Sequence, residues 1–402
     1  MQTILLAAEL GAGQGHVMRL ANAISHARDV VRPVWALRPS GFAHLQRLGL
    51  DVGDIVKAPS LPRVLNAERH FASQTLADPL ATWGFSSQDV LEMIIKRWRA
   101  LIDDVKPDLI VADFSPFLRL AAIEHVPMIM LGSGYTTPPI HLPLMQLPTM
   151  QPVLAAGQRV CERVLNNANS VLRKIGTAPI ERLSTLFHGD ETLVCVWPEI
   201  DPYRLERKVP HVGPFLQSST AVSEFEIVSH FHKRAYAYLH RPSRDQVEFL
   251  NNIAKAGWNI WLHATSKDEI HSFREGIRQC PLPLRADEIT SQFELIVHSG
   301  GAGLAQQAML SGMPQICVPV SAENFLTAKA VAELGSGALV TGGYAGSLSA
   351  IEEVLHHLFS PSAVEMRRQL SADLKNRLGQ SIWRQTLVDA MSRCGVDLAQ
   401  PR

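Results

Sequence analysis

The segment HSGGAGLAQQAMLSGMPQICVPVSAENFLTAKAVAELGSGALV, residues 298–340, decides how the chain is expected to fold. It follows a short apolar run, Leu295-Ile296-Val297, begins with a glycine-rich turn, and continues with an apolar helical pattern. A buried strand, a glycine-rich turn and a helix are the parts of a βα unit in a parallel sheet. Because ligands of open α/β sheets bind where the strands end, this turn is a candidate binding site.

Similar short apolar runs recur along the chain, each followed by glycine or polar residues and then by a helical pattern. Continuous apolar runs predict strands that are buried on both faces of a parallel sheet. We therefore predict an α/β protein with two Rossmann-like, doubly wound parallel sheets. The runs that support this prediction are residues 4–7, 109–112, 128–131, 193–196, 260–262, 295–297 and 316–318.

The length of 402 residues exceeds what one ordinary core supports, so two domains are expected. Residues 211–224 combine glycine, proline and a Ser/Thr cluster, which is typical of a linker. We predict an N-terminal domain over 1–215, a C-terminal domain over 216–376, and a final helix and tail over 377–402 that packs back on the first domain. Lys plus Arg and Asp plus Glu both number 38, so no basic excess points to nucleic acid.

The cysteines and the hydrophobic segments indicate a cytoplasmic protein. The five cysteines are odd in number and scattered without ligand spacing, as expected in a reducing compartment. The N-terminus lacks a basic segment before its apolar run, so we expect no signal peptide. No apolar stretch is long enough for stable membrane insertion. The sequence leaves open whether the protein forms a homodimer.

The turn at 298–303 has the composition of an anion site. Gly300, Gly301 and Gly303 lack Cβ atoms, so the backbone can approach an anion closely. A helix starting near Ala302 would direct its N–H groups and the positive end of its dipole at that anion. A tight turn that needs glycine for packing alone explains the same residues equally well.

An N-terminal turn also carries glycines, Gly11, Gly13 and Gly15, followed by His16. Their spacing is G-x-G-x-G and not the G-x-G-x-x-G of dinucleotide-binding proteins. The second strand, near residues 30–37, ends in Arg38-Pro39-Ser40 and offers no acidic residue for a ribose. A nicotinamide or flavin cofactor is therefore disfavoured, and the turn instead brings His16 to the carboxyl edge of the sheet.

Residues 294–340 resemble the donor-binding signature of inverting GT-B glycosyltransferases of the UDP-glycosyltransferase family, closest to its bacterial macrolide-type members. The matching features are the turn His298 to Gly303, Gly312-Met313-Pro314, Glu323-Asn324, Ala328 and Glu333 to Gly337. The similarity is strong over residues 294–340 and weak over the rest of the chain. It implies two Rossmann-like domains facing across a cleft and transfer of a sugar from a UDP- or dTDP-sugar to a hydroxyl group.

The resemblance also implies roles for particular residues. His16 would be the general base and Asp113 the carboxylate that orients it, as the catalytic residues. The donor-binding residues would be Gly15, Ser243, His298, Ser299, Gly300, Gly301, Ala302, Gly303, Leu304, Glu323 and Asn324. Glu323 and Asn324 would bind the sugar hydroxyls. A capping role for His16, a turn role for Asp113 and an ordinary helix start at Glu323-Asn324 remain alternatives.

The sequence departs from the family pattern at several donor positions. Leu304 replaces a threonine, Glu323-Asn324 replaces Asp-Gln, and His240 to Ser243 replace a Gly-Ser pair. No Asp-x-Asp motif follows a strand, so no metal or other cofactor is expected. These departures leave open a catalytically inactive nucleotide-binding relative that assists a partner, and a nucleotide-sugar epimerase or hydrolase on the same fold.

Two apolar segments of the N-terminal domain are the candidates for acceptor binding. Residues 59–87 contain Phe71, Trp83 and Phe85, and residues 133–153 form a proline-rich loop. Apolar linings with scattered polar groups are typical of small-molecule pockets. We therefore expect an apolar or amphiphilic small-molecule acceptor, with packing between structural elements as the alternative role for these segments.

Overall fold

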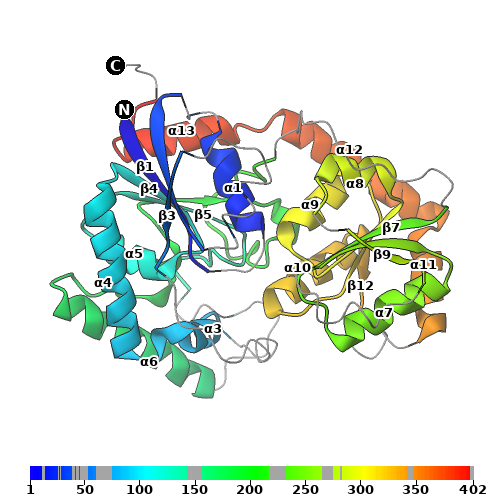
Figure 1. The fold of residues 1–402 in the computed structure, drawn as a ribbon, viewed down its shortest axis with the longest axis horizontal. Helices are drawn as coiled ribbons and strands as arrows, with labels where there is room; N and C mark the ends of the chain where they lie inside the picture. Colours follow the sequence, from blue (N-terminus) through cyan, green and yellow to red (C-terminus); the bar gives the residue numbers. More distant parts are fainter. Residues whose placement is uncertain are drawn as a thin grey trace. The chain divides into compact units, whose positions relative to one another are not determined.

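The computed structural model describes residues 1–10, 14–25, 27, 29–38, 41, 45, 53–59, 75–142, 146, 155–216, 232–264, 275–280, 283–341 and 347–398. The chain divides into two compact units. Unit 1 comprises Met1–Leu216 and Ser381–Arg402, and unit 2 comprises Gln217–Gln380. Each unit contains a six-stranded sheet with helices packed on it (Figure 1). The predicted α/β fold with two Rossmann-like parallel sheets is confirmed.

The sheet of unit 1 has the strand order β3-β2-β1-β4-β5-β6, and all of its pairs are parallel. Its strands are β1 (Gln2–Ala8), β2 (Val31–Leu37), β3 (Asp54–Lys57), β4 (Leu109–Asp113), β5 (Met128–Gly132) and β6 (Glu191–Val194). Its helices are α1 (Gln14–Ile24), α3 (Ala77–Leu80), η2 (Ala81–Phe85), α4 (Gln88–Val105), α5 (Pro116–Ala122), α6 (Ala155–Lys174), η3 (Leu183–Phe187), η4 (Pro198–Ile200) and α13 (Trp383–Arg393). The chain runs from β1 to β2 on one side and returns to β4 on the other, so the strand order reverses between β1 and β4.

Apolar side chains on both faces of β1 explain its continuous apolar sequence. Ile4 and Leu6 belong to a buried cluster that also contains Leu20 of α1 and Leu387 of α13. The alternate residue Leu5 is fully buried as well. Helices α1 and α13 therefore cover one face of this sheet, although α13 comes from the far end of the chain (red in Figure 1).

The C-terminal segment corrects the predicted boundary at 376/377. Helix α12 (Pro361–Gly379) runs through that position, and the chain changes unit after Gln380. The rings of Phe215 and Trp383 stack with centroids 4.4 Å apart, and Gln2 Nε2 donates to the Gly395 carbonyl at 3.0 Å. These contacts group the last residues with unit 1. The boundary between the units falls four residues later than predicted, because α12 continues without a break to Gly379.

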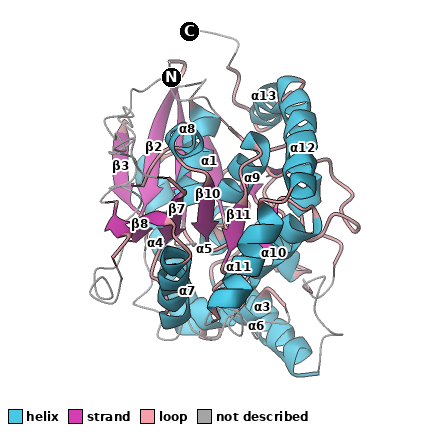
Figure 2. Cartoon of the chain, turned by 90° about the vertical axis from the view of Figure 1, so that its right-hand side faces the viewer, coloured by secondary structure: helices cyan, strands magenta, loops and turns pink. Residues whose placement is uncertain are grey.

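The sheet of unit 2 has the order β12-β11-β10-β7-β8-β9, with β10 and β11 side by side and parallel (Figure 2). Its strands are β7 (Arg234–Leu239), β8 (Asn259–Ala264), β9 (Ile277–Gln279), β10 (Leu295–His298), β11 (Gln315–Cys317) and β12 (Gly337–Leu339). Its helices are α7 (Arg244–Lys255), α8 (Ala286–Gln292), α9 (Ala302–Ser311), α10 (Ala322–Glu333), α11 (Leu348–Leu358) and α12. The strand order reverses between β7 and β10.

Two apolar clusters cover the two faces of this second sheet. Ala235 and Ala237 of β7 pack in one cluster with residues of α7 and α11, and Tyr236 packs in the other with residues of α8 and α9. The alternation along β7 follows from the two-residue repeat of a strand. Across the described ranges of the chain, the helices are too short or too polar to span a bilayer.

Candidate active site

The predicted residues of unit 1 meet where the strand order of its sheet reverses. Asp113 is the last residue of β4 and lies beside Ala8, the last residue of β1. His16 is in the first turn of α1, the helix that follows β1. This edge is the position at which doubly wound sheets bind their ligands.

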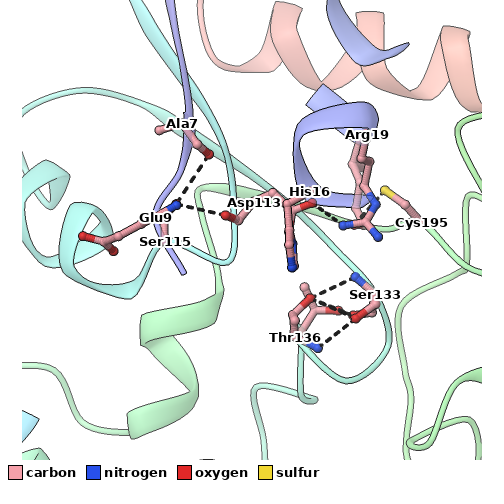
Figure 3. A network of polar contacts seen from close by, with 11 residues as sticks. Ala7, Glu9, His16, Arg19, Asp113, Ser115, Ser133, Thr136 and Cys195 are labelled. Carbon is pink, nitrogen blue, oxygen red and sulfur yellow. Dashed lines mark hydrogen bonds and ion pairs between the residues drawn. The ribbon is translucent and has the colours of Figure 1, made fainter. Parts of the chain in front are cut away.

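His16 and Asp113 are hydrogen-bonded, and a third residue joins them (Figure 3). The Nδ1 atom of His16 lies 3.0 Å from Oδ1 of Asp113. Arg19 Nη1 donates to the other carboxylate oxygen, Oδ2. The Asp113 side chain is fully buried, whereas those of His16 and Arg19 are 14% and 10% exposed. Arg19 was not predicted, although it follows His16 by three residues and so shares its face of the helix.

Backbone contacts between the ends of β1 and β4 hold this arrangement. The Glu9 N–H donates to Ser115 Oγ at 3.1 Å, and the Leu10 N–H donates to the Phe114 carbonyl at 3.1 Å. Phe114 has a φ of 47°, which is uncommon for a residue with a bulky side chain. That conformation places its ring against His16, with centroids 5.9 Å apart and planes at 19°. Phe114 therefore limits the orientations of the imidazole.

Glu9 is a buried carboxyl group beside this site. Its oxygens accept from Trp98 Nε1 at 2.5 Å, from the Phe117 N–H at 2.9 Å and from the Leu118 N–H at 3.4 Å. Burial, which outweighs these donors, raises the pKa of Glu9 to about 7. The side chain thus connects the end of β1 to the first turn of α5.

A second histidine–aspartate–arginine cluster lies in unit 1. His211 Nε2 is 2.7 Å from Oδ2 of Asp201, and Arg207 also binds this carboxylate. Arg207 Nη1 donates to the Thr137 carbonyl at 2.9 Å, and Nη2 donates to the Gly134 carbonyl at 3.1 Å. Burial works to raise the pKa of Asp201, but His211 and Arg207 outweigh it, so this pKa is lowered. The cluster anchors the loop that follows β5.

The candidate acceptor residues have different surroundings. Phe85 is fully buried and packs on Phe117 at 4.3 Å between centroids, so its predicted place at the acceptor is wrong: it is a core residue. Trp83 is half-buried and meets the Phe114 ring edge-on at 5.6 Å. Phe71 lies outside the described residues, as do 143–145 and 147–153 of the proline-rich loop.

The glycine turn of unit 2 packs closely against the start of α10. Gly300 has a φ of 92°, and a Cβ atom on it would lie 2.5 Å from the Asn324 carbonyl oxygen. This contact fixes the predicted diphosphate turn against the predicted sugar-binding pair. Gly301 is the N-cap of α9, and neither Gly301 nor Gly303 has an atom within 4 Å of a built Cβ. Both are exposed, as an anion-binding helix start requires.

His298, the last residue of β10, is only 1% exposed. Its Nε2 lies 2.9 Å from Oε1 of Gln315, and its Nδ1 accepts the Gly300 N–H at 3.0 Å. Burial lowers the pKa of His298 to about 4, so the imidazole is neutral at ordinary pH. The neutral ring shapes the glycine turn, and its predicted contact with the donor stays a prediction.

Gln315 extends this network across the sheet. Its Nε2 donates to Ser336 Oγ at 3.1 Å and to the Ala305 carbonyl at 3.4 Å. A Cβ on Gly337 would lie 2.4 Å from the Gln315 carbonyl oxygen, so this position needs glycine. The segment Gly335 to Gly337 of the predicted signature therefore holds the Gln315 side chain in place, and Gln315 in turn holds the His298 ring. Gln315 and Ser336 were not predicted.

The remaining donor candidates lie at helix starts along the same edge of the second sheet. Ser321 is the N-cap of α10 and accepts the Asn324 N–H at 3.3 Å, which places Glu323 and Asn324 in the first turn. Ser243 is the exposed N-cap of α7 and accepts the Gln246 N–H at 3.3 Å. Helices α7, α9 and α10 follow the adjacent strands β7, β10 and β11, so their N-termini share one edge.

Two donor candidates, Leu304 and Gly15, have less structural support. Leu304 in α9 packs against the apolar cluster around Tyr236. Gly15 in α1 is exposed and has no atom within 4 Å of a built Cβ. Gly11 and Gly13 lie outside the described residues. Within the described ranges, no three His, Cys, Asp or Glu side chains group as metal ligands.

Comparison with solved structures identifies the class of fold. A glycosyltransferase of kitacinnamycin gives a TM-score of 0.71 at 17% identity, with 98% of both chains covered. CalG4, the calicheamicin glycosyltransferase, gives 0.68 at 18% identity with 98% of both chains covered. VinC, a glycosyltransferase in complex with DTDP, gives 0.63 at 16% identity and covers 98% of this chain and 100% of its own. The chain therefore has the GT-B fold of antibiotic glycosyltransferases.

The C-terminal part of the chain has a more specific relationship. Residues 248–374 match the family described as Erythromycin biosynthesis protein CIII-like, C-terminal domain. The matched stretch belongs to unit 2 and includes the turn at His298 and the pair Glu323-Asn324. A comparison with curated protein sequences found no match. The predicted likeness to macrolide-type glycosyltransferases is thus confirmed for the fold and the C-terminal domain, and both comparisons indicate an enzyme of the glycosyltransferase class.

Proposed function

We propose that the protein is an inverting glycosyltransferase that moves a sugar from a nucleoside diphosphate to a hydroxyl group of a small apolar or amphiphilic acceptor. Unit 2 would bind the donor, and His16 of unit 1 would be the general base. The single observation that carries the proposal is the bond between His16 Nδ1 and the buried Asp113 carboxylate at the ligand-binding edge of the first sheet.

The imidazole of His16 suits this role for two reasons. Its unperturbed pKa of ~6.5 allows it to accept a proton near neutral pH. The bond to Asp113 favours the tautomer with the proton on Nδ1, so Nε2 carries the lone pair that would take the proton of the acceptor hydroxyl. The acceptor oxygen then attacks the anomeric carbon, and the bond from that carbon to the diphosphate breaks with inversion.

The start of α9 is proposed to hold the leaving diphosphate. The N–H groups of Ala302, Gly303 and Leu304 belong to its first turn and have no acceptor within the helix. Together with the helix dipole, they would stabilise the negative charge that develops as the diphosphate leaves. Glu323 and Asn324 would bind the sugar hydroxyls. No metal ion has a part in the proposal.

Binding and turnover test the proposal in separate steps. Isothermal titration with thymidine diphosphate and with UDP measures donor-site occupancy, since VinC was crystallised with the former. Turnover is measured by mass spectrometry with nucleotide sugars and a panel of aglycones. We expect His16→Ala to keep nucleotide binding and to lose about 10²- to 10⁴-fold in turnover. His356→Ala, an exposed site on α11, is the control and should retain both properties.

Other outcomes would select the alternative functions. Nucleotide binding with no transfer to any acceptor, and no effect of His16→Ala, would favour an inactive nucleotide-binding relative. Cleavage of the donor without acceptor, at a rate that acceptors do not raise, would favour a nucleotide-sugar hydrolase. An absence of nucleotide binding would contradict the proposed donor site in unit 2.

A further inference from the structure

Arg19 is a charged residue of the site to which neither the predicted mechanism nor the family resemblance assigns a role. We propose that Arg19 is a positioning residue that keeps the His16 imidazole unprotonated by sharing the Asp113 carboxylate with it. Its significance for catalysis rests on the function proposed above. The geometry behind it stands independently, because both contacts to Asp113 are present in the structure.

The division of the Asp113 carboxylate is the basis of the inference. Oδ1 faces Nδ1 of His16, and Oδ2 accepts from Arg19. A carboxylate that served His16 alone would stabilise the imidazolium and retain a proton on the base. A guanidinium is charged at every working pH, so Arg19 offsets the charge of Asp113 and repels a charge on His16. Because Asp113 is fully buried, water screens these effects weakly.

The other ionisable groups near His16 do not replace Arg19. Glu9, after β1, has a pKa raised to about 7 by burial, and Arg38 after β2 lowers it only in part. Cys195, after β6, has a pKa raised to about 12 by burial and stays a neutral thiol. The residues of β5, which also contacts α1, carry no ionisable side chain. Among these described neighbours, Arg19 is therefore the cation that binds the carboxylate of the base.

The second cluster of unit 1 provides an internal reference. His211, Asp201 and Arg207 repeat the three residue types, with the histidine and the arginine both on one buried carboxylate. This cluster anchors the loop after β5 and lies outside the proposed chemistry. A change at Arg19 should alter the titration of His16 and leave that of His211 as it is. Unfolding or a general charge effect would change both.

The test follows the histidine rings by NMR in the full-length protein. Uniform ¹⁵N-histidine labelling gives a titration curve for each imidazole, with His16 and His211 assigned from alanine variants. Arg19→Gln keeps a hydrogen-bond donor but removes the charge, and it should raise the His16 midpoint by about one pH unit. Arg19→Lys keeps the charge and should leave the midpoint close to that of the wild type.

Defined results would overturn the inference. A His16 midpoint that stays the same or falls in Arg19→Gln would exclude the proposed role, as would an equal rise in Arg19→Lys. If Arg19→Gln does not fold, Arg19→Met serves instead, because it keeps the aliphatic part of the side chain and removes the charge, and the His16 midpoint must rise there as well. A midpoint that stays the same or falls in Arg19→Met is also a refutation.

An activity measurement connects the inference to the proposed function without depending on it. If the protein transfers sugars, the acid limb of its kcat/KM profile should move to higher pH in Arg19→Gln by the shift seen by NMR, with the plateau value largely kept. A purely structural role would lower the plateau without moving the limb. An NMR shift in a protein that transfers no sugar would refute the proposed function and leave the role of Arg19 intact.

Discussion

His16 and His298 both lie at the carboxyl edge of the sheet in their unit, and their surroundings differ. His16 is in the first turn of α1, the helix after β1, whereas His298 is the last residue of β10, the position that Asp113 has in β4. His16 is partly exposed and bonds to the carboxylate of Asp113, whereas His298 is 1% exposed and bonds to the carboxamide of Gln315. The His298 ring holds the backbone at Gly300, whereas His16 is the ring for which we propose proton chemistry.

Burial and the contacts of both ring nitrogens keep His298 neutral at ordinary pH. A carboxylate accepts hydrogen bonds and stabilises an imidazolium, while a carboxamide oxygen accepts one bond from a neutral ring. His298 uses Nε2 toward Gln315 and Nδ1 toward the Gly300 N–H, an arrangement that requires the neutral form. In unit 2 the glycine backbone at the start of α9 is the proposed contact of the anion, and the predicted contact of His298 with the donor stays a prediction.

Asp113→Asn gives His16 the kind of partner that His298 has, and it should have the largest effect. An amide no longer fixes the tautomer or stabilises the imidazolium, so turnover should fall by about 10³-fold or more. Binding of thymidine diphosphate or UDP should stay within a factor of about two, because the proposed diphosphate and sugar contacts belong to unit 2. Single-turnover kinetics and isothermal titration measure the two quantities. Turnover close to that of the wild type would contradict the proposed role of Asp113 as the partner of a general base.

Gly300→Ala tests the backbone role of the second turn. The new Cβ would overlap the Asn324 carbonyl, and the φ of 92° is strained for alanine, so we expect a loss of about 3 kcal/mol in unfolding free energy. Nucleotide binding should disappear in the same variant. Gly303→Ala is the matched control, because nothing lies within 4 Å of its Cβ. It should keep its stability and weaken only nucleotide binding, and equal stability of the two variants would contradict this account.

Local sequence signals predicted most of the fold. Strands such as β1, β4 and β10 have two buried faces, so a few consecutive apolar residues reveal them. Strand β3 was missed because its residues are mostly exposed and give no apolar run. The boundary after α12 was placed four residues too early because this helix continues to Gly379, whereas the predicted packing of the final helix on the first unit agrees with the contact of Phe215 and Trp383.

The candidate site was predicted in part for similar reasons. His16 and Asp113 each follow an apolar run, and a parallel sheet brings such positions together. Arg19 could have been predicted in the same way, because it lies one helical turn after His16. Gln315 could not be found this way: its contacts with His298 and Ser336 depend on which side chains of neighbouring strands face each other.

The pH dependence of stability in unit 2 should follow His298. Its pKa is lowered to about 4 from an unfolded value of 6.5, so the unfolded chain takes up a proton first as the pH falls. The neutral ring therefore contributes stability that is complete above pH 6.5 and is lost toward pH 4, about 2 kcal/mol between pH 7 and pH 5. Denaturation of wild type and His298→Asn at both pH values should show that loss in the wild type alone. An equal loss in both would assign it elsewhere.

Glu9 gives unit 1 the opposite dependence, with an effect of similar size. Its pKa is raised from 4.5 to about 7 in the folded state, so between these values the folded protein holds a proton that the unfolded chain releases. Stability is therefore complete below pH 4.5 and falls as the pH rises through 7, by about 2 kcal/mol between pH 5 and pH 8.

Glu9→Gln measures this contribution, because it removes the titration and keeps the size of the side chain. The NH2 group of its amide would face the N–H of Trp98 Nε1, and two donors cannot form a hydrogen bond with each other. The variant should therefore be less stable than the wild type at pH 5. That deficit should shrink toward pH 8 as the wild-type carboxyl ionises in its buried position, and chemical denaturation at the two pH values measures it. If Glu9→Gln is less stable than the wild type by the same amount at both pH values, the three donors around Glu9 already keep its carboxylate charged at pH 5. The pH dependence of stability would then come from His298 in unit 2 and not from Glu9 in unit 1.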